Sequence, residues 1–339
     1  MIEKIPFIIA EMSGNHNQSL ERALAIVDAA ADAGVDAVKI QTYTADTMTI
    51  DIDTGEFFIS DKDSLWKGET LYHLYEKAHT PWEWHKAIFE RCKERGIMGF
   101  STPFDDTSVD FLEDLGVPCY KIASFENVDL PLIRKVARTG KPIIASTGMT
   151  TVAELSDLVQ TVRENGCTDL TLLKCTSSYP ASPEGTNLRT IPHMRELFGC
   201  AVGLSDHTLG IGAAVASVAL GAAVIEKHFT LSRAEGGVDA AFSLEPAEMA
   251  QLVRECRTAA LALGTVSYER AEQEQKSLQF RRSLYVVEDM KAGDVFTEKN
   301  LRRIRPGMGL SPKYYDIILG KKANCSITRG TAVQWDLIE

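Results

Sequence analysis

The stretch Phe7–Gln41, FIIAEMSGNHNQSLERALAIVDAAADAGVDAVKIQ, contains the unit on which the predicted fold depends. Its apolar run Phe7–Ala10 predicts a strand, and Leu20–Ala33 has the apolar spacing of an amphipathic helix. Gly34 stands where a helix C-cap is expected, and a second apolar run begins at Ala37. The stretch is therefore predicted to form a strand, a helix and a second strand.

This order of apolar run, loop and helical segment recurs through the first 263 residues. The apolar runs, each too short for a globular helix, are Phe7–Ala10, Ala37–Ile40, Met98–Phe100, Cys119–Ile122, Ile143–Ala145, Leu170–Leu173, Ala201–Leu204 and Val224–Ile225. Eight strand–helix units are the number that closes into a barrel. We therefore predict an α/β fold with a (β/α)8 TIM barrel over residues 1–265. A doubly wound open sheet is the alternative.

The segments outside this repeat have a different composition. The insert Tyr43–Thr80 is polar and aromatic and follows the second predicted strand, where a lid or a partner contact is expected. Residues 266–282 are rich in Glu, Gln, Lys and Arg and are predicted to form a linker. Residues 283–339 contain short apolar runs and turn signals but no long helical pattern. They are predicted to form a small β-rich second domain.

The composition limits the classes of function. The 339 residues carry a formal net charge of -11, which disfavours binding to nucleic acid or to an anionic membrane surface. The N-terminal segment carries charges at Glu3 and Lys4 and has no long apolar core, so no signal peptide is expected. No apolar run is long enough to cross a bilayer. The seven cysteines include no CxxC pair, which is typical of a reducing, cytoplasmic protein. The sequence has no Walker A motif, and no G-x-G-x-x-G follows the first predicted strand, so nucleotide binding has little support.

Polar residues follow the predicted strands, at the end of a barrel where function collects. Lys39 and Gln41 are two residues apart and therefore share one face of their strand. The residues that suit a bound phosphate are Lys39, Lys121, Thr102, Ser124, Ser146 and Ser205. Taken singly, each hydroxyl also suits a helix cap, and Lys121 also suits a surface charge. Their convergence on one end of a barrel predicts a phosphate site.

Histidines and carboxylates stand at the same strand ends. His207 and His228 follow the last two predicted strands, which are neighbours in a closed barrel, so their imidazoles are candidate ligands of one divalent ion. The alternative is two separate histidines satisfied by hydrogen bonds, and His16 is a third candidate ligand. The carboxylates expected nearby, each suited to a general base or to binding sugar hydroxyls, are Glu11, Glu126, Glu226 and Asp239.

Taken together and in order, these strings resemble the sialic acid synthase family over nearly the whole chain. The matching strings are Glu11 with Asn15-His16, Lys39-x-Gln41, Ser101-Thr-Pro-Phe104, Tyr120-Lys-Ile122, Ser146-Thr-Gly-Met149, Gly203-Leu-Ser-Asp-His-Thr208 and Glu226-Lys-His-Phe229. The terminal segment around Arg305 resembles the family's antifreeze-like (SAF) domain. Within the family, residues 236–246 and 75–84 are most similar to the pseudaminic acid synthases. The chain departs from the usual pattern at Val238, where a Pro is common, and at Ser177, where N-acetylneuraminate synthases have Asn.

The resemblance implies a role for each of these residues. His207 and His228 would bind a divalent metal ion, Mn²⁺ in preference to Mg²⁺ or Co²⁺. Phosphoenolpyruvate would be held by Lys121, Thr102, Ser124, Ser146, Ser177 and Ser205. The catalytic residues would be Glu11, Glu126 and Lys39, with Glu11 as the leading base. The sugar would be bound by Gln41, Tyr179, Asp239 and Arg305. The role of Arg305 requires a domain-swapped homodimer, because this residue would reach the barrel of a second subunit.

The implied reaction joins phosphoenolpyruvate, 2,4-diacetamido-2,4,6-trideoxy-L-altrose and water into a nine-carbon nonulosonate and phosphate. C3 of phosphoenolpyruvate would attack the metal-activated sugar aldehyde, and phosphate would leave by C–O cleavage. The nearest alternative is an N-acetylneuraminate or legionaminate synthase, which differs only in the N-acyl sugar. A Schiff-base aldolase using Lys39 or Lys121 and a non-catalytic carbohydrate-binding protein are more distant alternatives.

Overall fold

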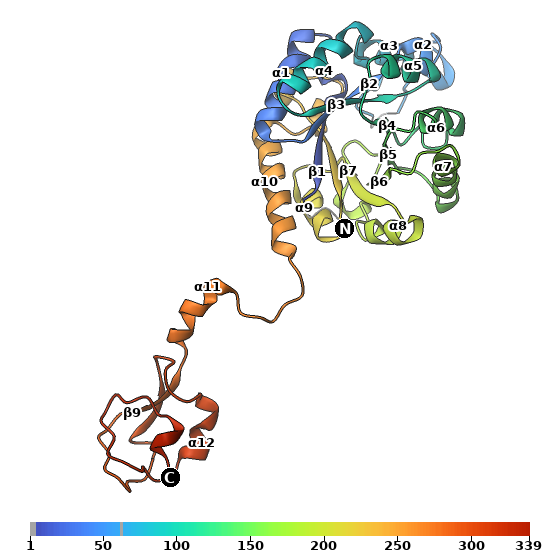
Figure 1. Cartoon of the computed structure of the whole chain (residues 1–339). Coiled ribbons are helices and arrows are strands. Elements are labelled where there is room, and N and C mark those ends of the chain that lie inside the picture. Colours follow the sequence, from blue (N-terminus) through green and yellow to red (C-terminus); the bar gives the residue numbers. More distant parts are fainter. Residues whose placement is uncertain (1–4, 62–63) are drawn as a thin grey trace. The chain divides into compact units, whose positions relative to one another are not determined.

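The structure is a computed structural model that describes residues 5–61 and 64–339 (Figure 1). The chain divides into two compact units, Met1–Gly264 and Thr265–Glu339. Glu3 and Lys4, on which the expectation of no signal peptide depends, lie outside the described residues.

A closed barrel of parallel strands makes up the first unit. Within the described residues, eight strands pair in the order of the sequence, and β8 pairs with β1 to close the ring. The strands are β1 Phe7–Glu11, β2 Ala37–Thr42, β3 Met98–Pro103, β4 Tyr120–Ile122, β5 Ile143–Ser146, β6 Leu170–Cys175, β7 Ala201–Asp206 and β8 Val224–His228. The closure confirms the predicted (β/α)8 barrel and excludes the open sheet, whose first and last strands would not pair.

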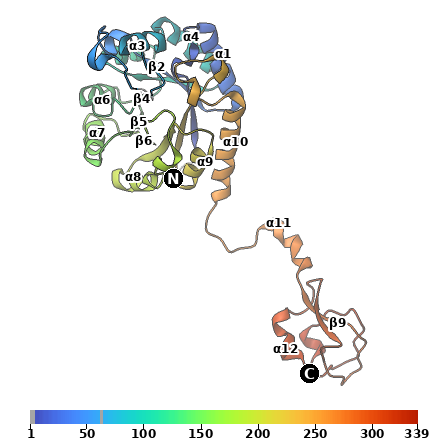
Figure 2. The same ribbon diagram turned by 180° about the vertical axis from the view of Figure 1, so that it is seen from behind.

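Helices cover the outside of the barrel, as the two opposite views in Figures 1 and 2 show. They are α1 Leu20–Ala33, α4 His85–Glu94, α5 Asp106–Asp114, α6 Leu130–Ala137, α7 Val152–Glu164, α8 Thr190–Phe198, α9 Gly212–Ala219 and α10 Pro246–Leu263. In α1, the Ser19 hydroxyl accepts a hydrogen bond from the backbone N–H of Arg22, and Gly34 ends the helix with φ of 85°. Ile26 and Val27 on its apolar face are fully buried in the core. Local capping and apolar spacing therefore account for this helix.

All of the barrel strands except β4 continue beyond the apolar runs that predicted them. β7 extends through Ser205 and Asp206 and β8 through His228, whereas the apolar runs stop at Leu204 and Ile225. Successive side chains of a strand point to opposite faces, so polar residues fit wherever each face offers them partners. The ends of these strands are therefore decided by pairing with neighbouring strands rather than by apolar content.

Two layers of side chains fill the barrel interior. The apolar layer consists of the buried residues Ile9, Ala37, Phe100, Cys119, Ile144, Leu173 and Val224. Two residues further along each segment stand Glu11, Lys39, Thr102, Lys121, Ser146, Cys175 and Glu226. Because the side-chain period of a strand is two, these polar residues form a second layer on the same inner face. The apolar layer is thus the floor of whatever site the polar layer forms.

The insert after β2 contains short elements. They are α2 Ala45–Met48, a 3-10 turn at Gly55–Phe57 and α3 Leu71–Ala78. The indole N–H of Trp66 donates a hydrogen bond to the carbonyl oxygen of Val238 at 3.0 Å. This bond joins the insert to the loop between β8 and α10.

The second unit has its own apolar core. Its elements are α11 Glu272–Gln275, β9 Ser283–Val286, β10 Leu301–Ile304 and α12 Tyr315–Ile318, and β9 and β10 pair antiparallel. The buried residues of its core include Leu284, Val286, Phe296, Leu301 and Val333. Across both units, none of the described helices combines the length and the apolar character needed to cross a membrane.

Candidate active site

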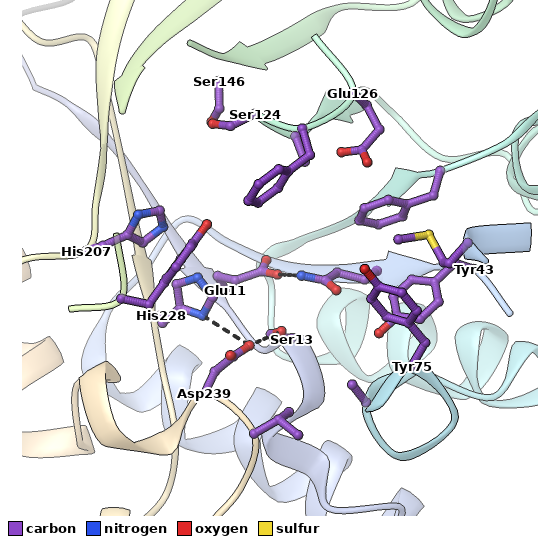
Figure 3. Close-up of a pocket in the computed structure, with 18 of the residues that line it drawn as sticks. Glu11, Ser13, Tyr43, Tyr75, Ser124, Glu126, Ser146, His207, His228 and Asp239 are labelled. Atoms are coloured by element: carbon purple, nitrogen blue, oxygen red, sulfur yellow. Dashed lines mark hydrogen bonds and ion pairs between the residues drawn. The ribbon is translucent and has the colours of Figure 1, made fainter. Parts of the chain in front are cut away.

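A cavity of about 500 Å³ is lined by residues from the C-terminal ends of the barrel strands and from the insert (Figure 3). This volume lies within the range of sites that hold small molecules. The polar layer of the barrel interior supplies the charged part of the lining.

Two lysines and two glutamates form a buried ionic cluster in this cavity. The ammonium of Lys39 lies 2.7 Å from Glu11 Oε2 and 3.9 Å from Glu226 Oε2. The ammonium of Lys121 lies 3.3 Å from Glu226 Oε1. Burial alone would raise the pKa of Glu226, but the charges of Lys121 and Lys39 hold it below its usual value. The cluster thus contains an ionised carboxylate between two cations.

Glu11 has a different environment from Glu226. Its Oε1 accepts a hydrogen bond from Gln41 Nε2 at 2.9 Å. Burial raises the pKa of Glu11 against the opposing effect of Lys39. Lys39 also donates to Thr102 Oγ1 at 3.2 Å, which holds its ammonium toward the strand-end hydroxyls. Glu11 is therefore better suited than Glu226 to take up a proton.

Hydroxyl groups stand beside the ionic cluster. Lys121 Nζ donates to Ser146 Oγ at 2.7 Å, and Ser205 Oγ donates to Glu226 Oε1 at 3.1 Å. All four side chains are almost completely buried. Two hydroxyls and a cation therefore lie where a bound anion would replace their present partners.

A glycine allows the next group of hydroxyls to come together. The backbone N–H of Gly148 donates to Ser124 Oγ at 3.1 Å. A Cβ atom at Gly148 would collide with the hydroxyls of Ser124 and Ser177. Only glycine permits this close approach, which leaves both hydroxyls beside a backbone N–H group.

The imidazoles of His207 and His228 are adjacent, with ring centroids 5.3 Å apart. His207 Nδ1 lies 3.0 Å from the carbonyl oxygen of Thr176, which only accepts, so Nδ1 carries the proton and Nε2 keeps a lone pair. His228 Nδ1 is buried without a hydrogen-bond partner, and burial lowers the pKa of this histidine. Burial lowers the pKa of His207, but its contacts with the side chain of Cys175 and the carbonyl oxygen of Thr176 raise it more. Two adjacent imidazoles in their neutral form are suitable ligands for a divalent metal ion.

The rest of a metal coordination sphere would have to come from outside these side chains. Among the described residues, no group of three His, Cys, Asp or Glu side chains is arranged to hold a metal ion. Asp239 Oδ2 lies 3.8 Å from His228 Nδ1 and accepts a hydrogen bond from the hydroxyl of Ser13. The pair of histidines therefore fits an ion that also takes oxygen ligands from substrate or water.

Glu126 stands apart from the ionic cluster. Burial raises its pKa to about 7, and its Oε2 has no hydrogen-bond partner. Figure 3 shows Glu126 across the cavity from His207 and His228. An unpartnered buried oxygen of this kind is a candidate acceptor for a ligand.

Comparison with known proteins identifies the family to which this cavity belongs. The sequence model of the NeuB family matches residues 26–268, and that of the SAF domain matches residues 281–339. The chain belongs to the NeuB family. It is 46% identical to the pseudaminic acid synthase of Campylobacter jejuni subsp. jejuni serotype O:23/36 over 332 residues, which cover 98% of this chain and 96% of that protein. It is 43% identical to the pseudaminic acid synthase of Helicobacter pylori over 338 residues, which cover 98% of each chain.

A solved structure similar to this NeuB-family chain is that of the N-acetylneuraminic acid (sialic acid) synthetase from Leptospira borgpetersenii serovar Hardjo-bovis, in complex with citrate. The two share 32% sequence identity with a TM-score of 0.71, and the match covers 82% of this chain and 92% of that chain. The fold and the predicted family resemblance are therefore confirmed together.

The structure of this NeuB-family member brings most of the predicted site residues into one cavity. Those that line it are Glu11, Lys39, Gln41, Lys121, Ser124, Glu126, Ser146, Tyr179, Ser205, His207, His228 and Asp239. Thr102 is buried behind Lys39, to which it is hydrogen-bonded. Ser177 Oγ lies 3.9 Å from Sγ of Cys175, a residue of the lining. Arg305 is an exposed residue of the second unit.

His16 is not among the residues that line the cavity. It is fully buried, its Nδ1 accepts a hydrogen bond from the backbone N–H of Gln18 at 3.2 Å, and its Nε2 lies 3.3 Å from Thr80 Oγ1. Burial lowers its pKa to about 4. Because both ring nitrogens have partners, His16 orients the loop after β1 and has no nitrogen left for a metal ion.

Several lining residues of the NeuB-family cavity were missed in the sequence. The insert and the strand ends contribute an apolar and aromatic set: Tyr43, Met48, Ile59, Trp66, Leu71, Leu74, Tyr75, Phe104 and Phe125. The spacing of Leu71, Leu74, Tyr75 and Ala78 on one helical face was the signal that could have indicated them. The position of Glu226 between two lysines had no such signal, because it depends on contacts among three strands.

Proposed function

We propose that the chain is a pseudaminic acid synthase. It would condense phosphoenolpyruvate, 2,4-diacetamido-2,4,6-trideoxy-L-altrose and water into a nine-carbon nonulosonate and phosphate. The similarity to two pseudaminic acid synthases over nearly their whole lengths supports this choice of product.

The observation that carries the proposal is the composition of the cavity. Two buried lysines, Lys39 and Lys121, share it with strand-end hydroxyls and with a pair of adjacent imidazoles. A binding protein for a neutral sugar would have no need to bury two lysines against carboxylates, because burying charge is costly. An enzyme for an anionic co-substrate needs such cations.

Phosphoenolpyruvate would bind at the lysine side of the cavity. Lys121, with the hydroxyls of Ser146 and Ser205, would hold one of its anionic groups. Ser124 and Ser177, on either side of the Gly148 N–H group, would hold the other. Thr102 would act through Lys39 by keeping its ammonium in place. These assignments rest on the hydrogen bonds that the same groups now make to one another.

A metal ion would activate the sugar aldehyde, and a general base would activate the attacking water. Bound to His207 and His228, a divalent ion, Mn²⁺ in preference to Mg²⁺ or Co²⁺, would polarise the aldehyde of the acceptor sugar. Glu11 would accept the proton of the attacking water, for which its raised pKa is suited. Lys39 would stay protonated beside Glu11: burial lowers its pKa, but the charges of Glu11 and Glu226 raise it more.

The proposed reaction forms one C–C bond and breaks the C–O bond to phosphate. C3 of phosphoenolpyruvate forms a bond to the aldehyde carbon, the C2–C3 double bond is used up, and the aldehyde oxygen takes a proton to become a hydroxyl. Water adds to the electron-poor C2 and gives a proton to Glu11. The C2–O bond to phosphate then breaks, the proton of the new C2 hydroxyl leaves with the phosphate, and a ketone remains. The proton held by Glu11 replaces the one that the aldehyde oxygen took up.

The acceptor sugar would occupy the other lining residues. Gln41, Tyr179 and Asp239 project polar atoms into the cavity and suit its hydroxyl and amide groups. Arg305 would contact the sugar from the second unit of a partner copy, in a domain-swapped homodimer.

A product assay tests the proposed function. The protein with added Mn²⁺ is incubated with phosphoenolpyruvate and, one at a time, with a panel of mono- and di-N-acetylated hexoses; phosphate release and the nine-carbon product are measured, the latter by mass spectrometry. We expect the highest kcat/KM with 2,4-diacetamido-2,4,6-trideoxy-L-altrose. A preference for N-acetylmannosamine or for the legionaminate precursor would reassign the sugar, and no phosphate release with any acceptor would overturn the proposal.

A further inference from the structure

Helix α3 of the insert turns an apolar face toward the cavity. Leu71, Leu74, Tyr75 and Ala78 have the i, i+3, i+4, i+7 spacing of one helical face, and all four line the cavity. None of the α3 side chains, all of which are described, is buried. The helix therefore has an amphipathic pattern whose apolar face is only partly covered by the rest of the barrel unit.

Other apolar side chains extend this face into a wall. The ring of Tyr43 packs edge-on against Tyr75 and Phe104, with centroid distances of 5.8 Å and 5.1 Å. Met48 lines the same cavity from the end of α2. We call the following set the apolar wall: Tyr43, Met48, Leu71, Leu74, Tyr75 and Phe104. Figure 3 shows Tyr43 and Tyr75 on the side of the cavity opposite His207 and His228, with Glu11 between them.

One carboxyl group lies on the side of the apolar wall. Glu126 Oε2 is buried and has no hydrogen-bond partner. The pKa of Glu126 is raised to about 7, chiefly by burial, and the pKa of Tyr75 is raised by burial and by the charge of Glu126. Glu126 lines the same cavity as the residues of the apolar wall. A hydrogen-bond acceptor next to an apolar surface is the complement of a group that carries both an N–H donor and a methyl group.

We propose that the apolar wall and Glu126 form a subsite for an acylamino substituent of the acceptor sugar. The amide N–H would donate to Glu126 Oε2, and the acyl methyl group would pack against the side chains of Leu71 and Leu74. This inference rests on the proposed function, which supplies an acceptor with two acetamido groups and a C6 methyl group. It assigns Glu126 to substrate binding at a distance from the imidazoles, and leaves Glu11 as the base.

The subsite predicts a specific selectivity. An acceptor with a hydroxyl in place of the acetamido group loses the methyl packing and leaves polar atoms against the apolar wall. A hydrophobic pocket distinguishes such analogues by about 10–200-fold in kcat/KM. The selectivity should therefore be clear but incomplete, and it should depend on the leucines of α3.

The test compares two acceptors and two variants of the full-length protein. The acceptors are 2,4-diacetamido-2,4,6-trideoxy-L-altrose and its analogue with a 4-hydroxyl group. The test variant is Leu74→Asn, and the matched control is Leu65→Asn, which changes a half-exposed leucine of the same insert that does not line the cavity. We expect Leu74→Asn to lower the preference for the diacetamido acceptor by about 10-fold, through the acceptor KM, with the KM for phosphoenolpyruvate unchanged. Leu65→Asn should behave as the unaltered protein.

The outcomes separate this inference from the proposed function. If the unaltered protein uses both acceptors equally, or if Leu74→Asn leaves the preference unchanged, the subsite is wrong while the proposed chemistry stands. If no acceptor releases phosphate from phosphoenolpyruvate, the proposed function fails first. Leu74→Ala, which keeps an apolar side chain, provides a second variant if Leu74→Asn does not fold, and it should lower the preference by a smaller factor.

Discussion

The outer and inner faces of strands β7 and β8 both contain buried charged residues, but the two faces differ in how completely these residues are paired. On the outer face, Asp206 and Lys227 stand opposite one another in the strand register, 2.7 Å apart, and both side chains are completely buried. Thr208 completes the arrangement, because its N–H donates to Asp206 Oδ1 and its carbonyl oxygen accepts from Lys227. Every charge on this face therefore has a partner within the chain.

On the inner face, only one residue away along the same strands, the partners are incomplete. Glu226 is shared between Lys39 and Lys121, and its Oε2 makes no hydrogen bond. His228 Nδ1, on the same face of β8, is also buried without a hydrogen bond, as is Glu126 Oε2 in the segment after β4.

This difference in pairing between the two faces indicates which of them binds a ligand. Buried polar atoms in native proteins are almost always satisfied, so a cluster of unsatisfied ones marks a place where another molecule completes the bonds. The outer pair holds the strands and the loop after β7, and the inner cluster is arranged for substrate. Substitutions on the two faces should therefore affect different quantities.

The largest effect on stability is expected from Asp206→Asn. The variant leaves the ammonium of Lys227 buried without a counter-ion, which should lower the free energy of unfolding by about 3–5 kcal/mol. The measurement is urea unfolding followed by far-ultraviolet circular dichroism, which reports the long helices of the barrel unit. The double variant Asp206→Leu/Lys227→Met removes both charges and should recover most of the loss. Equal losses in the single and double variants would show that the pair contributes by packing alone.

A large effect on activity, with little effect on stability, is expected from Lys121→Met. Loss of one buried donor at a reacting anion typically lowers turnover by about 10²–10³-fold. Unfolding should change little, because Lys39 remains to balance Glu226. The matched control is Lys174→Met, at the end of β6 but outside this cavity. If Lys121→Met unfolds as easily as Asp206→Asn, the distinction between the two faces is wrong.

A smaller, pH-dependent effect is expected from Glu126→Gln. The native carboxyl keeps its proton up to a pKa of about 7, whereas in the unfolded chain it ionises near 4.5. The native state therefore binds more protons between these values, and the contribution of Glu126 to stability falls as pH rises from about 4.5 to 7.

Glutamine does not ionise, so the Glu126→Gln variant should gain stability relative to the unaltered protein over this range. The gain should be about 2 kcal/mol, allowing for the partial exposure of the side chain. Burial is the main cause of the raised pKa of Glu126, with smaller effects from the nearby charges of Lys121, Asp129 and Lys39. Urea unfolding at several pH values measures the difference, and parallel curves for the two proteins would contradict the raised pKa.

Much of the barrel could be predicted from the sequence, because its signals are local. The helix α10 begins and ends where its apolar pattern does, at Pro246 and Leu263. Seven of the eight strands were placed correctly at their starts but ended too early, as at β7 and β8, whose last residues are polar; the prediction for β4 began one residue early and ended correctly at Ile122. The side-chain period of two indicated that Lys39 and Gln41 share a face, and both line the cavity.

The sequence by itself determined the number of strand–helix units, the change of pattern after the barrel and the inventory of charged groups. Apolar spacing and helix capping are properties of neighbouring residues, so they can be read along the chain. Only the tertiary structure decided that Lys227 pairs with Asp206 outside the barrel while Glu226, its neighbour, meets two lysines inside it. It also decided that the apolar face of α3 borders the cavity. These relations depend on barrel closure and strand register, which bring together residues far apart in sequence, and no local pattern specifies them.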